Sequence, residues 1–300
     1  MEKTAWQQRA RALARVALVA LALAPAAWPA GGQQAQNPSP MVEHTRAHPR
    51  LAEHVPPGRR EPLDLGTLFL SERLAIKPGQ KKAIPLLVMF HGGTWLPEAA
   101  GADLGLAVIA VQLGAGSATY ASALAAPGRF PAILSAAEQK AGVTFRPIVL
   151  AGWSAGCGGI RELLKQPGSM ERVESIIAID GIHADYVGGK PGPLESALET
   201  SRLEGWLQLA REAAAGRRHL LITHTEIFPG TFASTTETSD WLLRELGLRR
   251  RPVLEWGPMG TQRVSDTRAG RLRVQGYAGN SAPDHVDQLH ALTAWLKMVR

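Results

Sequence analysis

A tight turn with the pattern Gly-x-Ser-x-Gly constrains the fold of this chain more than any other stretch. It occupies residues 152–156, Gly-Trp-Ser-Ala-Gly. Glycines two positions before and two positions after Ser154 permit a bend that side chains would obstruct, and the bend lifts the serine oxygen clear of the backbone. Residues 146–151 form an apolar run typical of a strand, whereas 155–165 has helical spacing and ends before Pro167. We therefore expect a strand–turn–helix unit with Ser154 as a candidate nucleophile.

Apolar strands alternate with amphipathic helices along most of the chain. Strands are predicted at 84–90, 106–113, 146–151, 175–180, 219–224 and 272–276, with weaker edge strands at 63–70 and 73–76, and helices at 131–141, 155–165, 199–215, 234–246 and 286–299. This alternation predicts an α/β fold with a doubly wound, mainly parallel sheet and helices on both faces. Such sheets bind ligands beyond the carboxyl ends of their strands. Four candidate residues fall at those ends: His91, Ser154, Asp180 and His224.

The first 62 residues differ in composition from the remainder. Residues 1–30 combine four basic side chains with an apolar run at 16–24 that is too short to cross a bilayer. This pattern predicts a signal peptide; a membrane anchor is the alternative, which the short run and Pro25 disfavour. Residues 31–62 are polar and rich in proline, so we interpret them as a flexible extension. The predicted catalytic domain is then 63–300, in a protein exported to the periplasm or the extracellular space.

The formal net charge of +7 does not indicate a nucleic-acid partner. Residues 1–30 carry a net +3 of it, and the remaining +4 is spread along the chain apart from short arginine runs at 249–251 and 268–273. No motif of a nucleic-acid-binding fold accompanies this charge. We expect neither a nucleic-acid partner nor stable membrane insertion after signal cleavage. The single cysteine, Cys157, cannot form an internal disulfide, and its place just after the serine predicts a small packing residue.

Three features of the chain together resemble the α/β-hydrolase superfamily. They are His91-Gly92-Gly93 directly after a strand, Gly-Trp-Ser154-Ala-Gly at the nucleophile elbow, and a histidine late in the chain, His285. The resemblance covers residues 63–300 in the order of strands and helices as well as in motifs. It is strongest to secreted serine esterases of the lipase, feruloyl-esterase and polyester-depolymerase kinds. It implies a serine hydrolase that needs no cofactor and cleaves a small-molecule or polymeric carboxylic ester.

The resemblance also implies a catalytic triad in the chain order serine, acid, histidine, which begins with Ser154. His285 has the position of the family's histidine, on a loop before the last helix, and His290 one turn later is the fallback. Two carboxylates compete to orient the histidine. Asp180 ends the strand after the elbow, and Glu226 follows the next strand. We prefer Asp180, although the motif itself does not separate the two.

Backbone N–H groups are expected to stabilise the oxyanion of the reaction. The resemblance implies Ala155 as the first donor, and Gly93 or Thr94 as the second. The residues expected to line the substrate site are His91, Gly92, Trp95, Trp153, His183 and His224.

Two other functions remain open at this point. The strand-end histidines His91, His183 and His224 could serve a metal-dependent hydrolase, but no metal-ligand spacing such as His-Glu-x-x-His occurs, so no metal is expected. The chain could instead be a hydrolase-fold binding protein without catalysis. The loop at 185–196 lacks a long amphipathic segment, which predicts at most a small lid and a short or soluble substrate.

Overall fold

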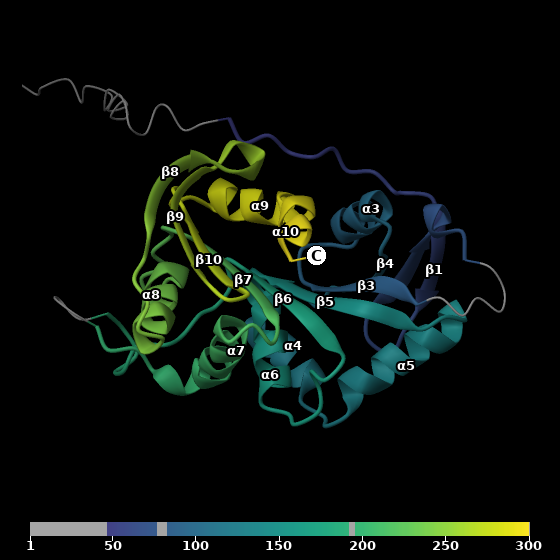
Figure 1. The fold of residues 1–300 in the computed structure, drawn as a ribbon, viewed down its shortest axis with the longest axis horizontal. Coiled ribbons are helices and arrows are strands. Elements are labelled where there is room, and N and C mark those ends of the chain that lie inside the picture. Colours follow the sequence, from purple (N-terminus) through teal and green to yellow (C-terminus); the bar gives the residue numbers. More distant parts are fainter. Residues whose placement is uncertain (1–46, 77–82, 192–195, 300) are drawn as a thin grey trace, which may run out of the picture. The chain divides into compact units, whose positions relative to one another are not determined.

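A sheet runs through the middle of the protein, with helices on both of its faces (Figure 1). The computed structural model describes residues 47–76, 83–191 and 196–299, and within these residues the sheet has ten strands in the order β1-β2-β4-β3-β5-β6-β7-β10-β9-β8. The six strands from β4 to β10 in this order are parallel to one another, and antiparallel strands extend both edges. The predicted α/β class with a mainly parallel, doubly wound sheet is confirmed.

The strands are β1 (Gly58–Pro62), β2 (Thr67–Ser71), β3 (Ile84–Phe90), β4 (Ala107–Val111), β5 (Phe145–Trp153), β6 (Val173–Ile179), β7 (His219–Thr225), β8 (Pro252–Trp256), β9 (Gln262–Ala269) and β10 (Leu272–Tyr277). The central strands consist largely of buried aliphatic residues because helices cover them on both sides. Their register places one apolar row across the sheet, made of Val88, Leu150, Ile176, Leu220 and Leu272. This row belongs to the larger of the two hydrophobic cores.

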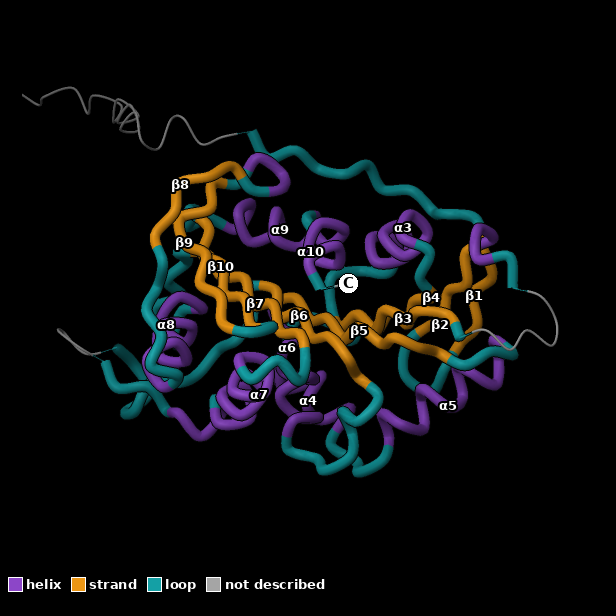
Figure 2. Tube along the Cα trace, viewed as in Figure 1, coloured by secondary structure: helices purple, strands orange, loops and turns teal. Residues whose placement is uncertain are grey.

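The helices are α3 (Trp95–Leu104), α4 (Ser117–Leu124), α5 (Arg129–Ala141), α6 (Cys157–Leu164), α7 (Glu204–Ala214), α8 (Thr235–Glu245), α9 (Ala282–His290) and α10 (Leu292–Met298). Helices α3, α9 and α10 cover one face of the sheet, and α4 to α8 cover the other (Figure 2). Each face has its own core, which contains Trp295 and Tyr277 on the first side and Trp206 and Phe130 on the second. Within the described ranges, no helix combines the length and the apolar character needed to cross a membrane.

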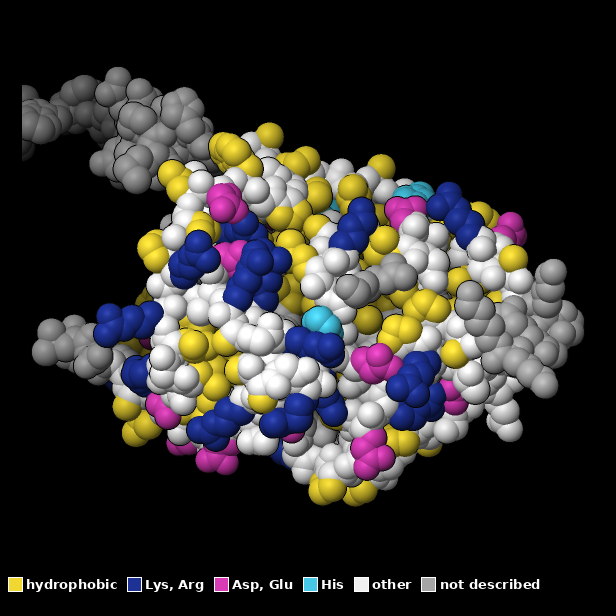
Figure 3. Space-filling model, in the orientation of Figure 1, with side chains coloured by type: hydrophobic (Ala, Val, Ile, Leu, Met, Phe, Trp, Pro, Cys, Tyr) yellow, Lys and Arg dark blue, Asp and Glu magenta, His cyan; other side chains and the backbone are white. Residues whose placement is uncertain are grey.

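Basic side chains concentrate over the antiparallel edge formed by β8, β9 and β10 (Figure 3). Asp266 lies among them and accepts hydrogen bonds from Arg268 and Arg273. Burial alone would raise the pKa of Asp266, but the hydrogen bonds and charges of these two arginines hold it well below its ordinary value. The basic cluster is therefore partly neutralised by a carboxylate at its centre.

The N-terminal boundary of the folded part differs from the prediction. Residues 1–46, which include the predicted signal peptide, lie outside the described residues. Strand β1 lies inside the predicted extension of residues 31–62, yet it pairs with β2 along its whole length. The predicted boundary at residue 63 therefore cuts through the sheet. The strand predicted at 73–76 is also wrong, because Glu72–Leu74 forms a turn of 3-10 helix that Ser71 caps.

The C-terminal helix begins earlier than its apolar spacing suggests. Ser281 caps α9 through a capping box, in which its hydroxyl accepts from the Asp284 N–H and the Asp284 carboxylate accepts from the Ser281 N–H. The helix therefore starts at Ala282 and ends near Ala291, where α10 follows. His285 consequently lies in the first turns of α9 and not on the predicted loop.

Candidate active site

The turn after β5 has the geometry that its glycines predict. Ser154 has a backbone φ of +50°, a left-handed conformation that non-glycine residues rarely adopt. A Cβ on Gly156 would lie 2.0 Å from the Phe90 carbonyl oxygen, and one on Gly152 would lie 3.0 Å from the Cys157 nitrogen. Helix α6 begins directly after this turn. The strand–turn–helix unit is confirmed, and it holds Ser154, half-buried, at the carboxyl end of β5.

His285 and Asp180 form a direct hydrogen-bonded pair next to this turn. The Nδ1 atom of His285 lies 2.7 Å from Oδ2 of Asp180. Asp180 follows β6, the neighbour of β5, and its own φ is +42°. A Cβ on the next residue, Gly181, would lie 2.5 Å from the Ser154 carbonyl oxygen, so the backbone at Asp180 packs against the turn that holds Ser154. The structure thus brings together the three residues predicted as a triad at one end of the sheet.

Four donors surround the Asp180 carboxylate, whose residue is only 2% exposed. Besides His285, they are the Thr225 N–H at 2.9 Å, the Thr225 hydroxyl at 2.7 Å and the Thr235 hydroxyl at 2.5 Å. Burial by itself would raise the pKa of Asp180, but the hydrogen bond and charge of His285, together with the two threonine hydroxyls, lower it below its ordinary value. Asp180 is therefore ionised at neutral pH, and the proton of the pair lies on His285 Nδ1.

Glu226, the alternative acid, has a different environment. It is exposed, and its carboxylate accepts from the Gly279 N–H at 3.4 Å, while its own N–H donates to the Gly279 carbonyl at 3.0 Å. Among the described residues, Asp180 is the carboxylate whose hydrogen bond to the His285 ring is observed. The geometry therefore favours Asp180 over Glu226 as the acid, which the motif alone did not distinguish.

Trp153 connects the elbow to the helix that carries His285. Its indole Nε1 donates to the His285 carbonyl oxygen at 3.1 Å. Its ring stacks on the His285 imidazole with centroids 4.6 Å apart, and on the His91 imidazole with centroids 4.9 Å apart. The residue before the nucleophile thus contacts both imidazoles of the site, and its half-buried ring forms part of the surroundings of Ser154.

His91 occupies the start of the loop after β3, and its ring contacts the Tyr120 hydroxyl. The Tyr120 hydroxyl accepts from the Leu113 N–H at 3.0 Å and lies 3.0 Å from His91 Nδ1. The hydroxyl donates to Nδ1 when the imidazole proton is on Nε2, and it accepts from Nδ1 in the other tautomer. Burial and the nearby His285 lower the pKa of His91, which favours the neutral imidazole.

The loop from His91 to Gly93 is held in a left-handed conformation, with φ values of 69°, 104° and 82°. A Cβ on Gly92 would lie 2.6 Å from the side chain of Leu289, so this glycine permits α9 to pack directly on the loop. The Gly93 N–H donates to the Gln112 side chain at 3.1 Å. Thr94 is exposed at the start of α3, and Ala155 is buried in the elbow. Of the two candidates for the second oxyanion donor, Gly93 already has an internal acceptor.

Trp95 and His183 are two further residues predicted to line the substrate site. Trp95 lies apart from the serine turn, and His183 lies partly inside the protein. The Trp95 ring lies against His290 and His54, with centroids 5.9 Å and 6.1 Å apart. His183 packs edge-on against Phe232, and its Nδ1 atom is buried without a partner. Burial lowers the pKa of His183, and the charges of Asp180 and His285 both reach it. His183 is thus near the Asp180–His285 pair, whereas Trp95 packs between α9 and the N-terminal segment.

His224 is not at the rim where its strand-end position predicts it. It is 1% exposed, its Nδ1 bonds to the Thr236 hydroxyl at 2.9 Å, and its Nε2 accepts from Arg250 at 3.2 Å. Burial and the charge of Arg250 lower the pKa of His224 to about 3. Both ring nitrogens are engaged inside the protein, so His224 is a structural residue rather than a substrate-binding or metal-binding one.

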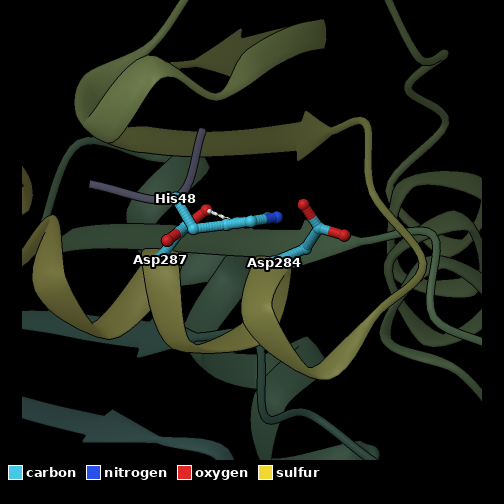
Figure 4. A group of neighbouring side chains, drawn as sticks. All are labelled: His48, Asp284 and Asp287. Carbon is cyan, nitrogen blue, oxygen red and sulfur yellow. Dashed lines mark hydrogen bonds and ion pairs between the residues drawn. The ribbon is translucent and has the colours of Figure 1, made fainter. Parts of the chain in front are cut away.

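One group among the described residues has the spacing of a metal site. His48, Asp284 and Asp287 bring ligand atoms within 4.8 Å of one another (Figure 4). However, the guanidinium of Arg50 contacts the Asp287 carboxylate, and Asp284 caps α9. A cation is therefore already paired with Asp287, and the group is better explained as part of an ion-pair network. The expectation that no metal takes part in catalysis stays a prediction.

The thiol of Cys157 is buried and inert. Its Sγ donates to the Gly152 carbonyl at 3.2 Å, and burial strongly raises its pKa. It packs in the core beneath the elbow, as its position predicts.

A cavity of about 690 Å³ lies beside α8 and the segment at 196–200. Phe228, Trp241 and Glu237 are among its lining residues, whereas Ser154 and His285 are not. Helix α8 lies between the two, since Glu237 of this helix lines the cavity and Thr235 donates to Asp180.

Several residues that shape the site were not found by sequence reasoning. Thr225 and Thr235 hydrogen-bond to Asp180, and Tyr120 contacts the His91 ring. Gln112 accepts from the Gly93 N–H, and Gly181 allows the segment of Asp180 to approach the elbow. The capping box at 234–237 was a usable signal for the first turn of α8, but it does not indicate that the Thr235 hydroxyl points at Asp180.

No protein-family model matches the chain, and no curated protein resembles it in sequence. Solved structures with a similar backbone include a cold-adapted esterase from an Arctic intertidal metagenomic library (13% identity, 81% of this chain and 93% of that chain covered, TM-score 0.42). Carboxyl esterase 2 from the mycorrhizal fungus Tuber melanosporum is another (18% identity, 85% of this chain and 89% of that chain covered, TM-score 0.44). A third is a ferulic acid esterase (14% identity, 78% of this chain and 90% of that chain covered, TM-score 0.44). At these values the likeness assigns no substrate to this chain.

Replacing the acid distinguishes Asp180 from Glu226 directly. We expect Asp180→Asn to lower kcat for an aryl ester by about 10⁴-fold, because the amide no longer stabilises the protonated imidazole and favours the wrong tautomer. Glu226→Gln should keep kcat within about twofold. Steady-state kinetics on both variants, with circular dichroism to verify folding, give the comparison. A larger loss for Glu226→Gln than for Asp180→Asn would contradict this assignment of the acid.

The buried neutral His224 predicts a pH dependence of stability. Its pKa is about 3 in the folded state and near 6.5 when unfolded, so the unfolded chain binds one more proton between these values. The contribution of His224 alone should therefore lower the free energy of unfolding by about 1.4 kcal/mol per pH unit as the pH decreases from 6.5 towards 3. His224→Gln should show a shallower slope in urea unfolding at several pH values, whereas replacement of the exposed His54 should not. Equal slopes for the wild type and His224→Gln would refute a neutral buried His224.

Proposed function

We propose that this protein is a serine hydrolase of carboxylic esters that acts through an acyl-enzyme on Ser154. The observation that carries the proposal is the hydrogen bond between half-buried His285 and buried Asp180, next to a strained turn that presents a serine. A fixed carboxylate, an imidazole and a serine at one end of a sheet are the parts of a nucleophilic acyl-transfer site.

The protonation states define the role of each group. Because Asp180 accepts the Nδ1 proton, Nε2 is the His285 nitrogen that acts as the base when the imidazole is neutral. Ser154 Oγ attacks the ester carbonyl carbon while its proton passes to Nε2. The tetrahedral intermediate then breaks its bond to the alcohol oxygen, which takes that proton and leaves. Water attacks the acyl-serine by the same route, and the carboxylic acid departs.

The oxyanion of each intermediate needs N–H donors that have no other acceptor. The Ala155 N–H, directly after the nucleophile, is the first. The second comes from the loop after β3, and we favour Thr94 over Gly93 because the Gly93 N–H donates to Gln112. The His91 imidazole, which stacks on Trp153 at the start of this loop, is a further polar group beside the substrate.

The substrate that fits this proposal is a small or polymeric ester whose carbonyl reaches an accessible, half-buried serine. The indole of Trp153 supplies an apolar and aromatic surface beside Ser154, which suits an apolar acyl or aryl group. A hydrolase-fold binding protein without catalysis is the rival function, and it would need no ionised acid on the His285 ring.

Replacement of the nucleophile tests the proposal. Ser154→Ala should lower kcat/KM for p-nitrophenyl acetate and p-nitrophenyl butyrate by about 10⁴-fold or more, because the acyl-enzyme cannot form. Ser135→Ala, on the exposed side of α5, is the matched control and should keep wild-type activity. A fluorophosphonate probe should label the wild type at Ser154 and leave Ser154→Ala unlabelled. Full activity in Ser154→Ala refutes the proposed nucleophile, and a wild type that neither labels nor hydrolyses esters supports the binding protein.

We further propose that the protein is exported, on the composition of residues 1–30. Expression of the full chain in a bacterium should yield a protein in the periplasm or medium whose intact mass lacks the first 26 or 30 residues, because Ala24-Pro25-Ala26 and Ala30 are the two small-residue cleavage options. Recovery of the uncleaved chain from the cytoplasm alone would contradict export.

A further inference from the structure

Helix α9 has two functional faces. His285 and Leu289, four residues apart, lie on one side, where they contact Asp180 and the Gly92 loop. Pro283, Asp287 and His290 follow the spacing i, i+4, i+7 and form a second face. Positions 285 and 287 are separated by about 200° around the helix axis, so the second face is turned away from the site.

The segment at residues 47–51, which we call the strap, covers this second face along the whole helix. It is part of the described chain that precedes β1 and runs over α9 and α3 (Figure 1). Arg50 Nη2 donates to the Pro283 carbonyl at 2.8 Å, in the first turn of α9. The Leu51 N–H donates to His290 Nδ1 at 3.2 Å, at the last residue of the helix. The strap therefore holds α9 at both of its ends.

A buried carboxylate, that of Asp287, lies in the middle of this second face of α9. Asp287 is fully buried, and its two oxygens meet His48 Nδ1 at 2.8 Å and the guanidinium of Arg50. Figure 4 shows the His48 ring reaching over α9 to the Asp287 carboxylate. A buried charge is destabilising unless it is paired, and loss of one partner leaves that cost uncompensated. The seating of α9 therefore depends on the Arg50 guanidinium and the His48 ring, which the strap supplies to Asp287.

We infer that Arg50 and Asp287 are positioning residues for the catalytic base: the strap presses α9 onto the site and thereby sets His285 against Asp180. This inference rests on the proposed function. Leu289 against Gly92, and Trp153 on the His285 carbonyl, limit α9 from the site side, and the strap limits it from behind. A helix held on one side only can rotate or move outward, and a displacement of about 1 Å at a catalytic group can cost about 100-fold in rate.

The test uses the full-length protein with one short p-nitrophenyl ester. Arg50→Ala should lower kcat about 10- to 100-fold and leave KM within about twofold, because the base is misplaced while the substrate still binds. Arg50→Lys should recover most of kcat, since an ammonium also pairs with the carboxylate. Arg73→Ala is the matched control, because Arg73 forms an exposed ion pair with Asp103 in the same N-terminal region. That variant should retain wild-type kcat and KM.

A double variant tests whether the effect passes through Asp287. In an Asp287→Asn background the buried charge is gone, so adding Arg50→Ala should lower kcat by much less than it does in the wild type. Where Arg50→Ala fails to fold, His48→Ala, which removes one of the two contacts to the carboxylate, should show a smaller loss of kcat in the same sense.

The outcomes separate this inference from the proposed function. Folded Arg50→Ala with unchanged kcat and a lower melting temperature would show that the strap only stabilises the fold, and would overturn the inference. A rise in KM alone would overturn it as well, since the strap would then affect substrate binding. Retained activity in Ser154→Ala, measured in the same assay, would instead refute the proposed function.

Discussion

The close approach of β3 and the elbow is the constraint on which the whole site depends. The carbonyl of Phe90 lies where a side chain at residue 156 would begin, so glycine is required there. That contact fixes the end of β3 against the turn after β5, and it sets the His91 loop beside Ser154. His91 and Ser154, the residues that directly follow β3 and β5, both have left-handed conformations. Strained backbone of this kind persists only where the surrounding packing enforces it, as the central strands do here.

Two buried carboxylates then place the base. Asp180 holds the His285 ring from the site side, and Asp287 ties the helix of His285 to the N-terminal strap. Each is satisfied by hydrogen bonds or opposite charge, which is the condition for burying an ionised group. The arrangement makes the orientation of one imidazole depend on segments more than two hundred residues apart in the chain.

The sequence predicts the parts of this structure that rest on local pattern. The elbow, the buried parallel strands and both candidate acids follow from apolar runs and from glycines near Ser154. The side chains that hold the acid do not, because nothing in the local pattern around Thr225 or Thr235 indicates which way a hydroxyl points. His224 shows the same limit, since a strand-end position does not reveal whether the ring faces the rim or the interior.

The strap illustrates a second limit of local pattern. Proline and polar residues before β1 are typical of a flexible extension, and periodicity contains no signal for docking. What orders residues 47–51 is a buried charge on a helix at the other end of the chain, which becomes visible only in the folded protein. Charge pairing of this kind is specified by three-dimensional proximity, whereas hydrophobic periodicity is specified along the chain. Residues that position a catalytic side chain through the opposite face of its helix are therefore the hardest to predict from a sequence.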